Sequence, residues 1–116
     1  MEDSRRTGLL GEVLAARYLR EKGYRIAAAN YRGGGGEVDI IAEKAGQYVF
    51  VEVKSRTGDG FFAPAEAVNY GKEERVKSAA AAFITAKKIK TPARFDIIEV
   101  MFKDDEHNIS HIENTF

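Results

Sequence analysis

The chain has 116 residues, 44% of them hydrophobic and 31% charged, which fits one globular domain and not a disordered segment. It contains no cysteine, which excludes a disulfide framework, a zinc–thiolate site and a cysteine nucleophile. No apolar run approaches the roughly 20 residues of a membrane span, and residues 1–6 lack the apolar stretch of a signal peptide. We therefore expect a soluble, cytoplasmic protein.

Charge is distributed unevenly, although basic and acidic residues balance at 18 each. Acidic residues outnumber basic ones in residues 37–71 and 95–116, and the reverse holds in residues 1–36 and 72–94. An acidic centre between basic segments is compatible with a metal-binding cleft flanked by phosphate-binding surfaces. Such a distribution is more commonly that of ordinary solvated helix faces, so charge alone does not identify a nucleic-acid partner.

The first predicted element is a helix over residues 4–22, ended by Gly23. Its apolar residues recur at helical spacing, namely Leu9, Leu10, Val13, Leu14 and Leu19. Glu12 shares a helix side with Gly8, Ala15 and Ala16. That small, apolar side predicts a carboxylate that faces the protein, and the alternative is an ordinary surface glutamate.

Three strands are predicted next. Residues 24–30 form the first, and the glycine run Gly33–Gly36 follows it. That run could bring backbone N–H groups close to a phosphate, or it could simply form a turn. Residues 37–42 form the second strand, and a turn at 44–47 leads to the third over 48–55, where valines alternate with other residues.

The rest of the chain is predicted as a loop over 57–71, a helix over 72–88 and a strand over 95–102. Residues 103–116 form an acidic tail, which from Asn108 could add an edge strand. This order predicts an α/β fold with a mixed sheet flanked by helices.

We expect one domain over residues 1–116, with a core over about 4–102.

The hairpin formed by the second and third strands concentrates carboxylates. The turn at 44–47 predicts that Asp39 lies opposite Glu52 and that Glu37 lies opposite Lys54. Opposed like charges destabilise a sheet unless a cation such as Mg²⁺ compensates them, and Mg²⁺ needs only one or two carboxylates. Lys54 could then orient an attacking water or neutralise charge on a phosphate. In the alternative, Lys54 bridges both carboxylates as a structural network.

This hairpin resembles the PD-(D/E)xK motif of the restriction-endonuclease-like superfamily, and especially archaeal Holliday-junction resolvases. Over roughly residues 8–102 the chain also resembles the bacterial YraN-like (UPF0102) family of predicted endonucleases. The motifs that carry this resemblance are Gly11-Glu12, Gly23-Tyr24, Asn30-Tyr31-Arg32, Gly36-Glu37-Val38-Asp39, Phe50-Val51-Glu52-Val53-Lys54-Ser55-Arg56, Pro64, Ala67-Val68, Lys72, Arg75 and Arg94-Phe95-Asp96.

The resemblance implies a restriction-endonuclease-like core that hydrolyses DNA phosphodiester bonds with Mg²⁺ or Mn²⁺. It also points to branched or junction DNA as a candidate substrate class. It implies that Asp39 and Glu52 bind the metal, that Lys54 assists, and that Glu12 matches a glutamate on the first helix of the resolvases. It also implies a homodimer. Glu37 stands where the superfamily motif has proline, which leaves it open whether Glu37 is a ligand or the partner of Lys54.

Basic and aromatic residues around the hairpin are candidates for DNA contact. Lys72, Arg75 and Arg56 are the predicted DNA-binding residues, although Arg56 could instead pair with Asp59. The aromatic residues Tyr31, Phe61 and Phe62 could stack on bases or pack in the core. We expect no catalytic role for His107 or His111. A second hypothesis for the function is a module that binds DNA or a protein on the same fold without cutting.

Overall fold

The computed structural model describes residues 4–57 and 70–116, and it describes side chains for residues 6–57 and 73–116. In chain order the elements are α1 (Ser4–Glu21), β1 (Arg25–Gly33), β2 (Gly36–Lys44), β3 (Gln47–Thr57), α2 (Tyr70–Lys87), β4 (Arg94–Lys103) and β5 (Glu106–Ile112). Neither of these helices is long and apolar enough to cross a membrane.

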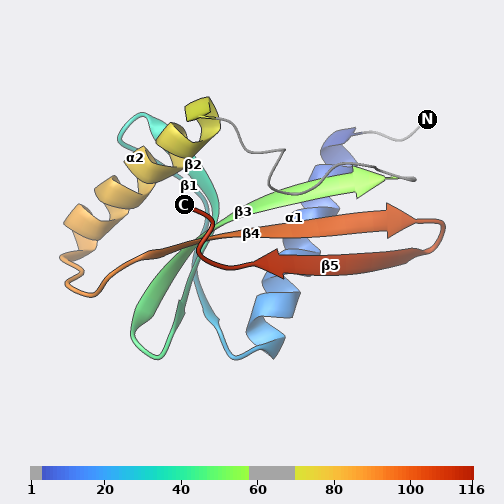
Figure 1. The fold of residues 1–116 in the computed structure, drawn as a ribbon, viewed down its shortest axis with the longest axis horizontal. Helices are drawn as coiled ribbons and strands as arrows, with labels where there is room; N and C mark the ends of the chain where they lie inside the picture. Colours follow the sequence, from blue (N-terminus) through green and yellow to red (C-terminus); the bar gives the residue numbers. More distant parts are fainter. Residues whose placement is uncertain (1–3, 58–69) are drawn as a thin grey trace.

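The strands form one sheet in the order β1-β2-β3-β4-β5 (Figure 1). Neighbouring strands are antiparallel except β3 and β4, which are parallel because α2 lies between them in the chain. The predicted α/β fold with a mixed sheet flanked by helices is confirmed.

Each helix covers one face of the sheet, because side chains alternate between faces along a strand. On β3, Val49 and Val51 join a buried cluster with Leu14 and Leu19 of α1. Phe50 points the other way and joins a cluster with Phe83 of α2. The alternating valines of the third predicted strand therefore mark the α1 face.

The C-terminal residues belong to the sheet and the core. β5 pairs with β4 from Lys103–Glu106 to Ile97–Ile112, and it begins two residues before Asn108, where the edge strand was predicted. After β5 the chain turns back, and the ring of Phe116 stacks on Phe95 with centroids 5.3 Å apart. The predicted acidic tail thus contributes a strand to the sheet and an aromatic contact to the core.

The glycine run forms the tip of the β1–β2 hairpin. Gly33 pairs with Gly36, and Gly34 and Gly35 make the turn with φ of 59° and 79°, which glycine adopts without strain. The tip presses against α2: a Cβ on Gly36 would overlap the carbonyl oxygen of Arg75. The run is therefore a tight turn that brings two backbones into close contact.

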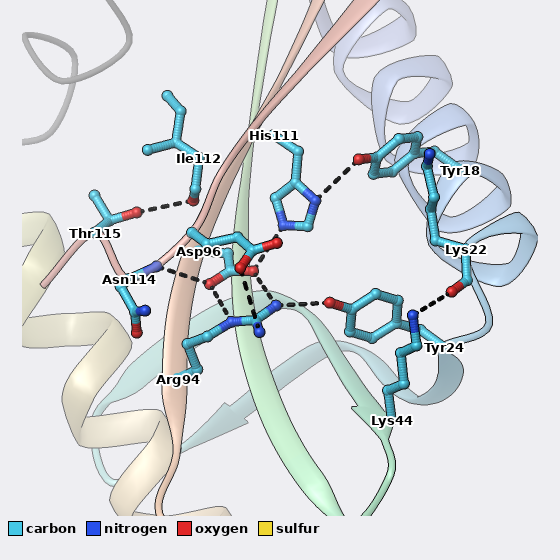
Figure 2. Close-up of polar contacts among 11 residues, drawn as sticks. Tyr18, Lys22, Tyr24, Lys44, Arg94, Asp96, His111, Ile112, Asn114 and Thr115 are labelled. Carbon is cyan, nitrogen blue, oxygen red and sulfur yellow. Dashed lines mark hydrogen bonds and ion pairs between the residues drawn. The ribbon is translucent and has the colours of Figure 1, made fainter.

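A buried ion pair between Arg94 and Asp96 lies at the start of β4 (Figure 2). The Asp96 side chain has 0% exposed surface, and Arg94 donates to it from Nε at 3.0 Å and Nη2 at 2.9 Å. The backbone N–H of Asn114 donates to the same carboxylate at 3.2 Å, and Arg94 also donates to the Tyr24 hydroxyl at 2.6 Å. These bonds tie β4 to the C-terminal residues and to the start of β1.

His111 extends this network to α1 (Figure 2). Its Nε2 lies 2.7 Å from Asp96 Oδ2 and donates, because a carboxylate only accepts. In the neutral ring Nδ1 then accepts from the Tyr18 hydroxyl, 3.1 Å away. Burial raises the pKa of Asp96, but the bonds from His111, Arg94 and Asn114 outweigh it and lower that pKa below its usual 3.8. His111 thus has a structural role that the sequence did not reveal.

Two glycine substitutions should change stability in opposite directions. Gly36→Ala should lower the free energy of unfolding by about 1–3 kcal/mol, because the new methyl group meets the backbone of α2. Gly8→Ala should raise it by roughly 0.5–1 kcal/mol, because the position is helical and a Cβ there meets nothing within 4 Å. Urea unfolding of both variants checks this, and a stable Gly36→Ala protein would contradict the close contact.

Asp96→Asn should lower the free energy of unfolding by about 3 kcal/mol, because it removes the buried counter-charge of Arg94 and leaves only the more exposed Glu113, 3.5 Å away, as an acidic partner. The pKa of Asp96 is lower in the folded protein than its usual value of 3.8. The ionised side chain therefore stabilises the fold fully above pH 3.8, and this stabilisation is lost as the pH falls through the pKa of the folded state. The stability difference between parent and variant should thus narrow below about pH 4. Denaturation across pH measures it, with Asp104→Asn in the exposed β4–β5 turn as the control.

Candidate functional site

The sheet splits between β2 and β3. Their ladder runs from Lys44–Gln47 to Ile40–Val51, and β3 then continues beside β4 as far as Thr57. β2 continues beside β1 to the hairpin tip, which leans on α2 (Figure 1). The first residues beyond the split are Asp39 on β2 and Glu52 on β3.

The split confirms part of the predicted register and corrects the rest. The expected pairing is confirmed from the turn to Ile40–Val51. The predicted ladder pairs Asp39–Glu52 and Glu37–Lys54 do not form, because β2 and β3 no longer pair at that point. Glu37 is instead opposite Arg32 of β1, with which it makes an ion pair of 3.8 Å.

A kink in the β1–β2 hairpin marks the same place. Asn30 of β1 has a left-handed backbone with φ of 52°, a conformation that asparagine tolerates better than most residues. Across from it, Val38 and Ile41 both pack against α2 although they are three residues apart, so regular alternation breaks at Asp39. Asp39 Oδ2 accepts a hydrogen bond of 2.8 Å from the backbone N–H of Val53, which bridges the split.

Glu12 reaches this place from α1. The helix lies close to β3 here, since a Cβ on the buried Gly11 would overlap the Ser55 hydroxyl. Burial raises the pKa of Glu12, and the negative charges of Asp39 and Glu37 raise it further. A hydrogen bond with the Asn30 side chain lowers the pKa but does not cancel these effects. Glu12 therefore lies close to Asp39 and is half-buried, as its side of the helix predicted.

Glu52 and Lys54 occupy the sheet face that β3 turns toward α2. They alternate with Val51 and Val53 and share the side of Phe50, as the sequence predicted. Both are buried, with 3% and 9% of their surface exposed. Burial of ionisable groups is costly and is typical of sites where their chemistry is used, although structural networks also bury them.

Glu99 of β4 is a member of this region that the sequence analysis missed. It pairs in parallel register with Lys54, so the two side chains lie on the same face. It is 6% exposed, and its Oε2 has no hydrogen-bond donor among the described residues. Burial raises the pKa of Glu99, and the charge of Arg56 lowers it. An ionisable residue between Ile98 and Val100 was the available signal.

The flanking residues divide into those near the site and those elsewhere. Arg56 is half-buried beside Glu99, while its alternative partner Asp59 lies outside the described residues. Arg75 is exposed on α2. The side chain of Lys72, and both Phe61 and Phe62, also lie outside the described part of the chain. Tyr31 packs edge-on against Phe83 with centroids 5.3 Å apart, so its packing role is the one observed.

The donor set limits which metal site is possible. Among the described residues, no three His, Cys, Asp or Glu side chains gather closely enough to hold a metal ion. A preformed cage is therefore absent from that part of the chain. The carboxylate oxygens of Asp39 and Glu52, beside the split between β2 and β3, fit Mg²⁺. This ion commonly uses one or two carboxylates and completes its shell with water and phosphate oxygens.

Asp39→Asn should lower the pKa of Glu12, because it removes a neighbouring negative charge. The amide oxygen can still accept the bond from Val53, so the fold should persist. NMR titration of the Glu12 carboxyl carbon measures the shift, with Glu106→Gln at the distant β4–β5 turn as the control. An unchanged Glu12 titration would contradict the closeness of the two carboxylates.

Comparison with known sequences covers every residue of this site. The sequence model described as "Uncharacterised protein family UPF0102" matches residues 11–100. A UPF0102 protein of Alkaliphilus oremlandii is 41% identical over 97% of this chain and 99% of its own length. One of Syntrophus aciditrophicus is 42% identical over 100% of this chain and 92% of its own length. One of Bacteroides thetaiotaomicron is 40% identical over 100% of this chain and 96% of its own length. The chain therefore belongs to the UPF0102 family, as its YraN-like motifs predicted.

Proposed function

We propose that this protein is a cytoplasmic, Mg²⁺-dependent nuclease that hydrolyses DNA phosphodiester bonds, with branched or junction DNA as its preferred substrate. One observation carries the proposal: Asp39 and Glu52 are the first residues beyond the end of the β2–β3 ladder, and the Asp39 carboxylate accepts a hydrogen bond of 2.8 Å from the backbone N–H of Val53, the residue after Glu52. The resemblance of this hairpin to the PD-(D/E)xK motif supports the same conclusion and a restriction-endonuclease-like core.

Each residue has a distinct role in this proposal. Asp39 and Glu52 would hold Mg²⁺, which when bound supplies a Lewis acid and lowers the pKa of a water molecule. The ammonium of Lys54 would orient the attacking water and stabilise negative charge that develops on the phosphate. Glu12, whose pKa is raised, would accept a proton from a water molecule at the edge of the site. The bond from Val53 would keep the Asp39 carboxylate in place.

We include a homodimer in the proposal, because a four-way junction is resolved by two cuts in two strands. Two copies related by a two-fold axis would present two equivalent sites to such a substrate.

The proposal is tested by a cleavage panel of single-stranded, duplex, flapped and four-way DNA, with and without Mg²⁺ or Mn²⁺. The parent protein should cut only with metal. Asp39→Asn, Glu52→Gln and Lys54→Met should each lower the rate about 100-fold or more, because each removes a group that acts on the reacting phosphate. Glu74→Gln, an exposed carboxylate on α2, is the matched control and should cut like the parent.

Circular dichroism must show that the variants fold, so that lost cleavage reports chemistry. Cleavage by Asp39→Asn at the parent rate would refute the proposed site.

The second candidate is a module that binds DNA or a protein without cutting. The described part of the chain has no cluster of three metal-ligating side chains, and a module that only binds DNA or a protein does not need one. Calorimetric titration with Mg²⁺ or Mn²⁺ separates the candidates, because a module without catalysis has no need of the ion. Binding that disappears in Asp39→Asn supports the nuclease, and no measurable binding supports the module.

A further inference from the structure

A surface cleft lies between the tip of the β1–β2 hairpin and α2, beside the candidate site. Its volume is about 460 Å³, and its walls are Arg32, Gly33, Gly35, Gly36, Glu37 and Arg75. Two arginines and one glutamate are among these described residues, so this part of the wall carries a net positive charge. The glycines add no side chains, which leaves their backbone open to a bound group.

The chemistry of this wall suits a phosphate. Guanidinium groups bind phosphate oxygens through paired N–H donors, and they stay charged at any physiological pH. The Arg32 side chain is 80% exposed, and Arg75 is exposed on α2, so both can reach a ligand. A single exposed arginine would be ordinary, but here two of them from different elements border one cleft.

The packing of the hairpin tip on α2 holds the two arginines at a set separation. A Cβ on Gly36 would overlap the carbonyl oxygen of Arg75 itself, and one on Gly34 would lie 2.7 Å from the carbonyl oxygen of Ser78. The backbones that carry Arg32 and Arg75 are therefore in direct contact. Little ordering of the backbone is then needed on binding, which favours affinity.

The cleft is close to the proposed reaction centre. Glu37 forms part of its wall and lies two residues from Asp39, about 6.6 Å along the strand. The charge of Glu37 also raises the pKa of Glu12, which places the wall within electrostatic reach of the carboxylates. This separation is comparable to the distance between neighbouring phosphates along one DNA strand.

We infer that this cleft binds a backbone phosphate of the DNA strand that occupies the candidate site, close to the bond to be cut. Arg32 and Arg75 are the phosphate ligands. Glu37 holds Arg32 at 3.8 Å in the free protein and competes with the phosphate for it. The inference rests on the proposed DNA substrate, but it concerns binding and does not require cleavage.

Fluorescence anisotropy with a labelled four-way DNA junction tests the cleft, in EDTA so that no metal binds and no DNA is cut. Arg32→Ala and Arg75→Ala should each weaken binding about 5- to 10-fold and reduce the slope of log K against log salt by about one. Lys87→Ala and Lys88→Ala remove the same charge at the exposed far end of α2 and should weaken binding less than 2-fold. Equal losses in both pairs would show general attraction and overturn the inference, as would no DNA binding by the parent.

Glu37→Gln gives a test of opposite sign. Removing the competing carboxylate should tighten binding in EDTA about 2- to 5-fold, and unchanged or weaker binding would overturn the assignment of Arg32 as a phosphate ligand. Failure of the nuclease proposal remains distinguishable. If the parent protein never cuts DNA but needs Arg32 and Arg75 to bind it, the phosphate site stands and the nuclease proposal fails. If the protein cuts and binds DNA equally well without these arginines, the phosphate site is refuted and the nuclease proposal stands.

Discussion

The separation of β2 from β3 after the Ile40–Val51 pair is the constraint on which the candidate site depends. Up to that pair the two strands share main-chain hydrogen bonds and two apolar faces. Beyond it, β3 is held by its parallel pairing with β4, and β2 is held by β1 and α2. Polar side chains can therefore enter between the strands, and the carboxylate of Asp39 takes over a hydrogen bond that a strand carbonyl would otherwise make.

The carboxylates at the split do not stabilise the fold on their own. Burial and two neighbouring negative charges raise the pKa of Glu12, so its ionised form is disfavoured there. Stability comes from elsewhere: the apolar clusters on both faces of the sheet and the network around Asp96. This division is typical of proteins that keep unfavourable groups for function and offset their cost in other regions.

The Asp96 network and the glycine tip also position the site from two sides. Through His111 and Tyr18 the network holds α1 against the sheet, and α1 carries Glu12 to the split. The glycine tip holds the β1–β2 hairpin against α2, which keeps β2 away from β3 and brings Arg32 near Arg75. One packing contact thus serves both the candidate site and the adjoining cleft.

Local patterns in the sequence were sufficient to predict the helices, the strands, the mixed sheet, the hairpin register up to Ile40–Val51 and the family. Periodicity, turn glycines and β-branched residues act over a few neighbours, so they can be evaluated from the sequence alone. Only the tertiary structure showed that the sheet splits at Asp39, that Glu99 lies beside Lys54, and that His111 bonds Asp96. These relations join residues from distant parts of the chain, and the competition between β1, β4 and the helices for the strands decides them.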